Sequence, residues 1–266
     1  MPESIIKVSA GRRLDDLTAA REPLRILAIG PAKIGKSVFL ASAPKPMLVL
    51  SVEGGMQSSL GTPDTVEYKV TDWREVSAWR EELRTNPNPL QSWGIKGKVA
   101  SVGWDSVTEM YGGPLRQAIL AHPRRSKQED PDLYSERDYG RAMDVLLDEY
   151  RLWRTLPINI VITSEIGEHK DNLGKTLYTA KMAGQLDFKL PHAVDWVIFL
   201  GVKDGDSAGT RVGYIGSMPG ILAGNRIPMT VATSVPKLID EPTIPKILSL
   251  IDGAYVKLAA DAKKVG

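Results

Sequence analysis

The residue pattern with the most specific chemistry is the string GPAKIGKS at 30–37. It matches G-x-x-x-x-G-K-[ST], in which glycines let the backbone wrap around an anion without Cβ clashes. The pattern predicts a nucleotide site, with the Lys36 ammonium at the β- and γ-phosphates and the Ser37 hydroxyl on Mg²⁺. The alternative is a Gly-Pro turn before an ordinary helix. Residues expected to line the nucleotide site are Gly30, Pro31, Ala32, Lys33, Ile34, Gly35, Lys36, Ser37 and Val38.

Two acidic residues follow apolar runs that are typical of buried strands. Asp105 comes directly after the run at 99–104, where a carboxylate can hold a water ligand of Mg²⁺. The alternative for Asp105 is an N-cap of the next helix. Glu53 follows the run at 47–52, where a carboxylate can orient and deprotonate an attacking water. Because Glu-Gly-Gly is also typical of an exposed turn, the role of Glu53 stays open at this point, whereas Ser37 and Asp105 are the expected metal ligands.

The composition excludes several classes of site. The chain has 266 residues, of which 42% are hydrophobic and 25% charged, and it contains no cysteine. Disulfides, thiolate metal sites and cysteine nucleophiles are therefore excluded. The net charge of +2 is too small to attract nucleic acid or membrane by bulk electrostatics, so such a partner would need a local basic patch.

Short apolar runs that alternate with helical patterns carry these residues. Apolar side chains recur at helical spacing within 73–83 and 143–153. Strands buried on both faces and separated by helices predict an α/β fold with a mainly parallel central sheet flanked by helices. The expected strands are 24–29, 47–52, 99–104, 158–163 and 194–200, with short antiparallel strands within 201–224 as a C-terminal extension.

Two polar stretches interrupt this alternation, at Gly112–Asp138 and Gly167–Gln185. Both are predicted as long loops, and long loops in compact domains tend to be functional or disordered. The expected organisation is an N-terminal arm at 1–23 that could serve in assembly, one ATPase-type core at 24–234, and a tail at 235–266.

Together the motifs resemble RecA-like P-loop ATPases, more closely the small phage nucleotide-binding proteins that include the Sak-type recombination and annealing ATPases. The resemblance implies that Glu53 in LSVEGG is the catalytic base and that Asp105-Ser106 in GWDSVTE is Walker B. It also implies that the two long loops face single-stranded DNA. The DNA-contacting candidates are Arg124, Arg125 and Lys127 in the first loop and Lys170, Lys175 and Lys181 in the second, and a solvated loop of mixed charge is the alternative.

The chain departs from this family pattern at two places. Where relatives place an amide or histidine that senses the γ-phosphate, this chain has Ser164-Glu165, so the sensing role falls to Ser164 or is missing. Arg226 stands where relatives have a Lys-x-Arg segment that reaches a neighbouring subunit's nucleotide. It is either an arginine finger acting in trans or an ordinary surface arginine.

The expected function is an Mg²⁺-dependent, DNA-stimulated ATPase acting on single-stranded DNA in phage-type recombination or annealing. ATP and Mg²⁺ are the expected ligands, and self-association into a ring or filament is expected. One alternative is a nucleotide-gated assembly or packaging accessory with little turnover, and a weaker one is a small-molecule P-loop kinase. The chain shows no apolar run long enough to cross a bilayer, so we expect a cytoplasmic protein, in the host cytoplasm if phage-encoded.

Overall fold

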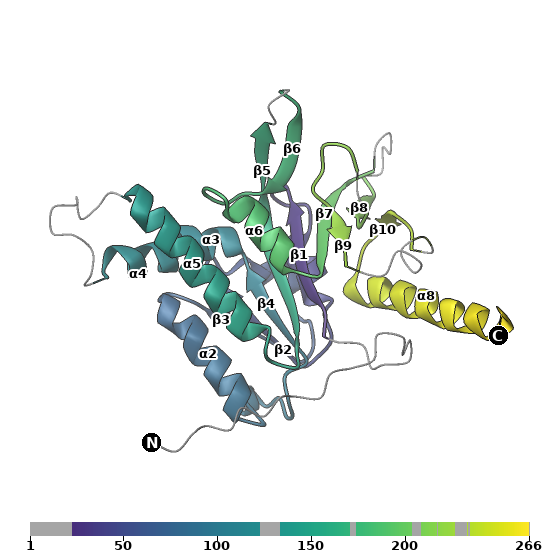
Figure 1. Cartoon of the computed structure of the whole chain (residues 1–266). Coiled ribbons are helices and arrows are strands. Elements are labelled where there is room, and N and C mark those ends of the chain that lie inside the picture. Colours follow the sequence, from purple (N-terminus) through teal and green to yellow (C-terminus); the bar gives the residue numbers. More distant parts are fainter. Residues whose placement is uncertain are drawn as a thin grey trace, which may run out of the picture.

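The fold is given by a computed structural model (Figure 1). It describes residues 23–122, 134–170, 174–203, 209–216, 218–226, 233 and 235–265. The predicted N-terminal arm lies outside the described residues, apart from Pro23. Among the described helices, none is long and apolar enough to cross a membrane.

A mainly parallel sheet forms the centre of the molecule, with the strand order β10-β8-β7-β1-β5-β4-β2-β3. All neighbours from β7 to β3 along this order are parallel, whereas β8 and β10 are antiparallel additions at one edge. Off this path, β6 pairs with β5 and β9 with β7. The strands are β1 (Arg25–Gly30), β2 (Met47–Ser51), β3 (Thr65–Lys69), β4 (Ser101–Asp105), β5 (Asn159–Lys170), β6 (Thr176–Ala180), β7 (Trp196–Val202), β8 (Arg211–Tyr214), β9 (Gly224–Asn225) and β10 (Leu238–Asp240).

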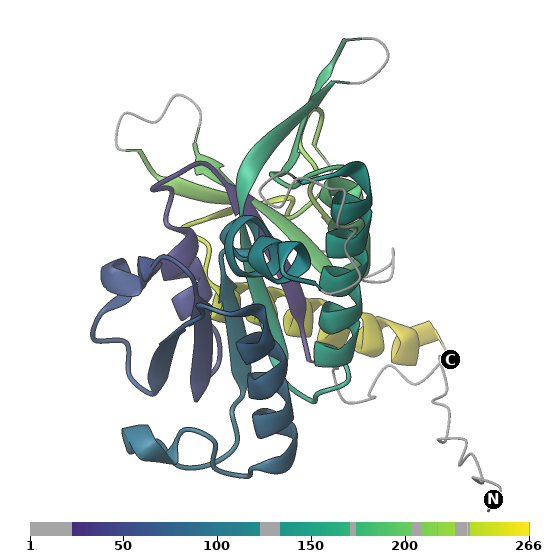
Figure 2. The same cartoon turned by 90° about the vertical axis from the view of Figure 1, so that its left-hand side faces the viewer.

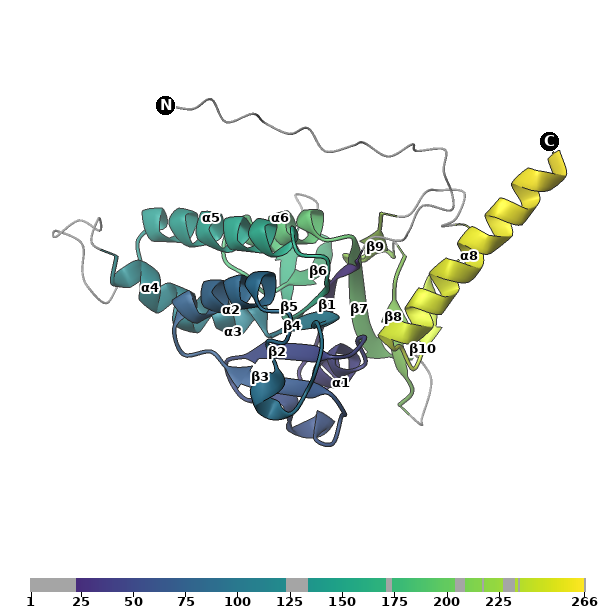
Figure 3. The same ribbon diagram turned by 90° about the horizontal axis from the view of Figure 1, so that it is seen from below.

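Helices cover both faces of this sheet (Figure 3). Successive residues of a strand point to opposite faces, so the buried strand β1 sends Leu27 and Ile29 into one core and Ile26 and Ala28 into the other. The first core lies under α2, α3, α5 and α6, and the second under α1 and α8. The helices are α1 (Lys36–Ala41), α2 (Trp73–Thr85), α3 (Val107–Met110), α4 (Arg116–Leu120), α5 (Glu136–Trp153), α6 (Leu186–Ala193) and α8 (Ile244–Val265). The predicted α/β fold with a flanked, mainly parallel sheet is confirmed.

Both stretches predicted as long loops contain regular structure. Within Gly112–Asp138, a π-helical turn joins α3 to α4 and α5 begins at Glu136, because Leu115 and Ile119 pack into the core and keep the chain helical past Pro114. Within Gly167–Gln185, the end of β5 and β6 form an antiparallel hairpin. The hairpin projects from the sheet (Figure 2).

The segment predicted as a tail takes part in the same fold. Strand β10 pairs with β8 at the sheet edge, and α8 buries Ile244, Ile247 and Ile251 in the second core. The backbone NH of Ile244 also donates a 2.9 Å hydrogen bond to Oγ of Ser42, just after α1. The C-terminal segment is thereby fixed beside the helix that follows the glycine-rich loop.

Candidate active site

The loop at 30–37 joins the end of β1 to the start of α1, as its sequence predicts. Gly35 has a φ of 96° and Lys33 a φ of 64°, which is left-handed backbone that glycine adopts without steric cost. Gly30 is buried at the end of β1, and Ile34, Gly35, Lys36 and Ser37 are half-buried, whereas Pro31, Ala32, Lys33 and Val38 are exposed. The loop therefore offers one exposed rim and one inner side to a ligand.

The ammonium of Lys36 lies against its own loop. It donates hydrogen bonds to the carbonyl oxygens of Gly30 at 3.0 Å and Pro31 at 2.9 Å. Burial lowers the pKa of Lys36, and the negative charges of Glu165 and Asp105 act in the opposite direction. A lysine so placed can exchange carbonyl partners for phosphate oxygens within the same loop.

The predicted metal ligands meet beside the loop. The Ser37 hydroxyl donates a 2.8 Å hydrogen bond to Oδ2 of Asp105, and Thr163, within the intervening strand β5, donates a 2.6 Å bond to Oδ1. A carboxylate and a hydroxyl are hard oxygen donors that fit Mg²⁺, which usually keeps few protein ligands and completes its shell with phosphates and water. Within the described part of the chain, no group of three or more His, Asp or Glu side chains is placed to hold a metal ion. The two-residue donor set thus fits a Mg²⁺ that arrives with a polyphosphate.

Glu53 follows β2 at the same sheet edge and is exposed. The backbone NH of Val52 donates a 3.3 Å hydrogen bond to the carbonyl of Asp105, the last residue of β4. Glu53 is the next residue after Val52, so it follows this contact directly. A Cβ on Gly55 would lie 3.3 Å from Oδ2 of Asp105 and 3.8 Å from Oγ of Ser37. Gly55 therefore leaves the space in front of this pair free of a side chain, a role that the sequence reading of Glu-Gly-Gly missed.

Carboxylates gather around this edge. Burial raises the pKa of Glu109 on α3, and the charges of Glu53 and Glu165 raise it further, while Lys181 acts in the opposite direction. Glu53 follows β2, Glu109 lies on α3, and Glu165 lies on β5 beside the last residue of β1. The site therefore combines a cationic loop with a group of acidic side chains next to it.

Ser164, predicted as a γ-phosphate sensor, is fully buried. Its hydroxyl donates a 3.0 Å hydrogen bond to the carbonyl of Glu165 and lies 3.1 Å from Oγ1 of Thr108. The Thr108 hydroxyl also accepts a 3.2 Å bond from the Glu165 backbone NH. The Ser164 hydroxyl thus holds β5 against α3, next to the metal-site residues.

Glu165 connects the loop to the hairpin. It stands beside Gly30 in the β1–β5 register, and its Oε2 forms a 2.7 Å ion pair with Nζ of Lys181 after β6. The other two hairpin lysines, Lys170 and Lys175, are exposed near the hairpin tip. The remaining DNA candidates Arg124, Arg125 and Lys127 lie outside the described residues.

Arg226 lies far from its own loop. Its backbone NH donates a 2.9 Å hydrogen bond to the Asp195 carbonyl, and its guanidinium contacts the His192 carbonyl oxygen. Asn225 pairs with Trp196 at the start of β7, whereas the loop follows the far end of the parallel strand β1. By this register Gly30, the last residue of β1, lies opposite Leu200, four residues along β7 from Trp196, which is about 13 Å at about 3.3 Å per residue. The bonds of Arg226 thus go to Asp195 and His192 and not to the loop of its own chain.

Arg211, the first residue of β8, was not predicted as a site residue. It opposes Val202 at the end of β7, and its guanidinium lies so close to the loop that a Cβ on Gly35 would be 2.6 Å from Nη1. Nη2 of Arg211 donates a 2.9 Å hydrogen bond to Oε2 of Glu241. Because its neighbours come from distant segments, the sequence carries no local signal for this contact.

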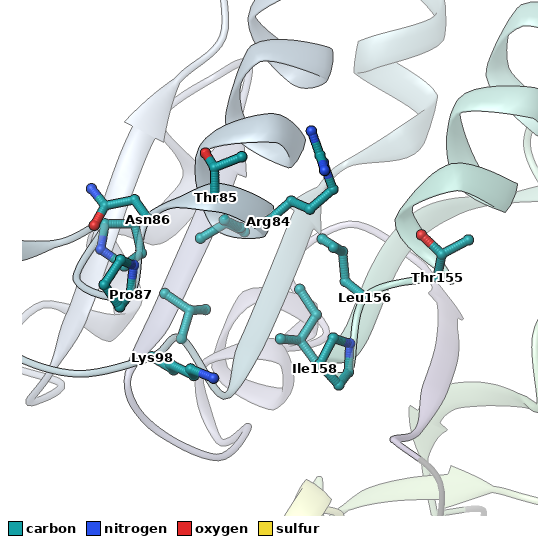
Figure 4. Close-up of a pocket in the computed structure, with 12 residues that line it drawn as sticks. Arg84, Thr85, Asn86, Pro87, Lys98, Thr155, Leu156 and Ile158 are labelled. Atoms are coloured by element: carbon teal, nitrogen blue, oxygen red, sulfur yellow. The ribbon is translucent and has the colours of Figure 1, made fainter.

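A cleft of about 430 Å³ lies at the opposite edge of the sheet, where α2 ends and β4 and β5 begin (Figure 4). Figure 4 shows Arg84, Pro87, Lys98, Leu156 and Ile158 around it. Its described lining is largely aliphatic and proline-rich and contains no predicted site residue. The cleft is thus separate from the glycine-rich loop.

Comparison with known proteins identifies one family. A family model described as an AAA domain matches residues 22–227, which includes the loop, β4, the hairpin and Arg226. The search of curated proteins returned no match.

Proposed function

This chain belongs to the AAA-domain family of P-loop ATPases, and we propose that it hydrolyses ATP with Mg²⁺ while bound to single-stranded DNA. The biological setting of this proposal is recombination or annealing of the phage type. The observation that carries it is the 2.8 Å hydrogen bond between Ser37 and Asp105 beside the loop. It joins the first turn of α1 to the end of β4, where a phosphate-bound metal needs its protein ligands.

Each residue of the site has a distinct part in hydrolysis. Lys36 neutralises the β- and γ-phosphates from within the loop, and Ser37 and Asp105 hold the metal. When bound, Mg²⁺ supplies positive charge to the phosphate oxygens and orients them for attack. Glu53 takes the proton of the attacking water, because it is an exposed carboxylate one residue beyond the Val52–Asp105 contact.

The β5–β6 hairpin supports contact with DNA. It continues β5 beyond the same sheet edge as the loop and carries the exposed Lys170 and Lys175 (Figure 2). Lysines on a projecting ribbon suit a phosphate backbone, and their contribution falls with salt. The ion pair between Glu165 and Lys181 joins the hairpin base to the residue beside Gly30. DNA on the hairpin and nucleotide on the loop therefore act on neighbouring residues.

The position of Arg226 supports self-association. Since it lies at the end of β7 remote from its own loop, a finger role places it on the nucleotide of an adjacent copy. Head-to-tail contacts of this kind form rings or filaments, in which each copy needs only a small basic strip to bind DNA.

Glu53→Gln tests the ATPase directly. We expect turnover to fall by about 100-fold or more, because the amide cannot accept the proton, while ATP affinity stays within about threefold of wild type. Glu67→Gln, on the exposed face of the edge strand β3, is the matched control and should retain full activity. Unchanged turnover in Glu53→Gln would overturn the assignment.

The DNA part is tested separately with the full chain. We expect ATP at low salt to produce a shift of a labelled single-stranded oligonucleotide and the oligonucleotide to stimulate phosphate release. If neither occurs while ATP hydrolysis proceeds, the DNA proposal is wrong and the ATPase proposal stands.

A second candidate is a nucleotide-gated assembly module with little turnover. It is favoured by the contacts in the middle of β5, where the Ser164 hydroxyl is engaged with Thr108 and Glu165 pairs with Lys181. Such a module binds ATP and then changes its assembly state, which light scattering measures. Glu53→Gln leaves its slow hydrolysis unaltered. Phosphate transfer to a small-molecule acceptor would instead indicate a kinase.

A further inference from the structure

Arg211 and Gly35 form a contact that the nucleotide site described above does not use. Strand β8 begins at Arg211, opposite Val202, so this side chain starts at the sheet edge where β1 ends. A Cβ on Gly35 would lie 2.6 Å from Nη1 and 3.4 Å from Cδ of Arg211. The bare backbone of Gly35 thus lets a guanidinium lie directly against the loop.

Glu241 holds Arg211 in this position through three hydrogen bonds. Its Oε2 accepts from Nη2 at 2.9 Å, its Oε1 accepts from the Arg211 backbone NH at 3.2 Å, and its own NH donates to the Arg211 carbonyl at 2.7 Å. The side chains are 42% and 55% exposed, so their ion pair contributes little to stability. Glu241 also has a φ of 42°, a backbone conformation that is costly for a non-glycine residue. Stability alone does not account for this arrangement.

The contact lies on the side of the loop away from the metal site. In the strand order, β5 lies between β1 and the strands β4 and β2, which carry Asp105 and precede Glu53. On the other side of β1, β7 lies between β1 and the strand β8 that begins at Arg211. The metal and the attacking water act at the γ-phosphate, on the Asp105 and Glu53 side. A guanidinium on the β7 side therefore faces the part of a polyphosphate that stays bound after hydrolysis.

We infer that Arg211 binds the α- and β-phosphates of the nucleotide in its own chain, and that Glu241 is its positioning residue. The inference rests on the proposed binding of ATP at the loop. A guanidinium forms forked, charge-assisted hydrogen bonds with phosphate oxygens, and one held in place by a carboxylate loses little freedom on binding. The C-terminal segment with β10 and Glu241 is then part of the nucleotide site.

The test measures the affinity of the full chain for fluorescent ATP and ADP analogues, together with KM and kcat. Arg211→Ala should weaken ATP and ADP alike by about tenfold and raise KM, with kcat changed by less than about threefold. Arg211→Lys should recover part of the affinity, and Glu241→Gln should weaken it by a smaller factor. Lys203→Ala is the matched control, since Lys203 forms a 3.0 Å ion pair with Asp240 on the same sheet edge. It should bind like wild type.

Lys36→Ala separates the inference from the function on which it rests. If Lys36→Ala abolishes binding while a folded Arg211→Ala binds both nucleotides within about twofold of wild type, the inference is wrong and the ATP site stands. If Arg211→Ala weakens only ATP and lowers kcat, the residue acts at the γ-phosphate and the assignment is overturned. If the wild type binds neither nucleotide, both proposals fail. Thermal unfolding of each variant confirms that it is folded.

Discussion

The hydroxyl of Thr163 donates a 2.6 Å hydrogen bond to Oδ1 of Asp105, and both residues are buried. The other carboxylate oxygen accepts from Ser37. Asp105 is thereby oriented from β5 on one side and from α1 on the other. A residue that orients a ligating carboxylate by a hydrogen bond affects the affinity of the site for the metal without contacting the metal itself.

Thr163→Val should raise the Mg²⁺ concentration that half-saturates ATP hydrolysis by about tenfold, because valine keeps the shape and removes the bond to Oδ1. Activity at saturating Mg²⁺ should recover to near wild type. A Mg²⁺ titration of phosphate release measures both. Thr179→Val is the control, since the Thr179 hydroxyl is buried but bonded to the Asp187 carbonyl at the hairpin base. Equal Mg²⁺ dependence in both variants would contradict the role of Thr163.

How far the fold can be predicted from sequence depends on burial. The strands β1, β2 and β4 and the first parts of β5 and β7 are buried on both faces and stand out as apolar runs. Strand β3 at the sheet edge has the sequence TVEYK, with only Val66 buried, so apolarity gives no signal there. The hairpin could not be predicted for the same reason, because backbone pairing rather than side-chain burial holds Glu168, His169 and Lys170 in a strand.

The site divides along similar lines. Lys36 and Ser37 are predictable because all residues of the phosphate-binding motif are consecutive in the sequence. Asp105 is predictable because it ends a buried strand. Thr163 and Arg211 are not, since Thr163 is 58 residues from Asp105 in the chain and Arg211 is still farther from Gly35. Only the packed sheet brings these residues together.

The charge of Glu165 predicts a pH effect on nucleotide binding. Burial lowers the pKa of Lys36 and Glu165 is the main group that raises it, so Glu165→Gln lowers this pKa further. ATP binding needs the charged ammonium of Lys36. As the pH rises, ATP affinity should therefore begin to fall at a lower pH in Glu165→Gln than in wild type. ATP affinity measured from neutral to alkaline pH checks this, with Glu67→Gln as control. Superimposable profiles for wild type and Glu165→Gln would refute it.

Glu109 predicts a pH-dependent gain in stability. Its pKa is raised above the ordinary value of 4.5, first by burial and then by Glu53 and Glu165. The folded state binds this proton more tightly than the unfolded chain, so the carboxylate destabilises the fold above the raised pKa and not below pH 4.5. Glu109→Gln should raise the Tm by about 1–2 °C at neutral pH, and the gain should disappear toward pH 4.5. Thermal unfolding at several pH values measures it, and a gain that persists at acid pH would contradict the cause.

Arg226 predicts complementation between two inactive variants. It is bonded near the start of β7, about 13 Å along the sheet from the end of β1 where the loop begins, so we expect a finger to act on the next copy. The hydrolysis rate of Arg226→Ala alone should fall by about 10³-fold. Lys36→Ala alone should be inactive, because the loop of every copy lacks its lysine.

Mixed in equal amounts, these variants should recover activity, because a loop from the Arg226→Ala chain meets an intact Arg226 from the Lys36→Ala chain. Random mixing places such a pair at about a quarter of the interfaces, which sets the expected fraction of wild-type phosphate release. Arg151→Ala, which removes an exposed arginine of α5 paired with Asp148, should be active without a partner. If the mixture is no more active than the sum of its parts, Arg226 does not act across an interface, and its bonds to His192 and Asp195 serve only its own chain.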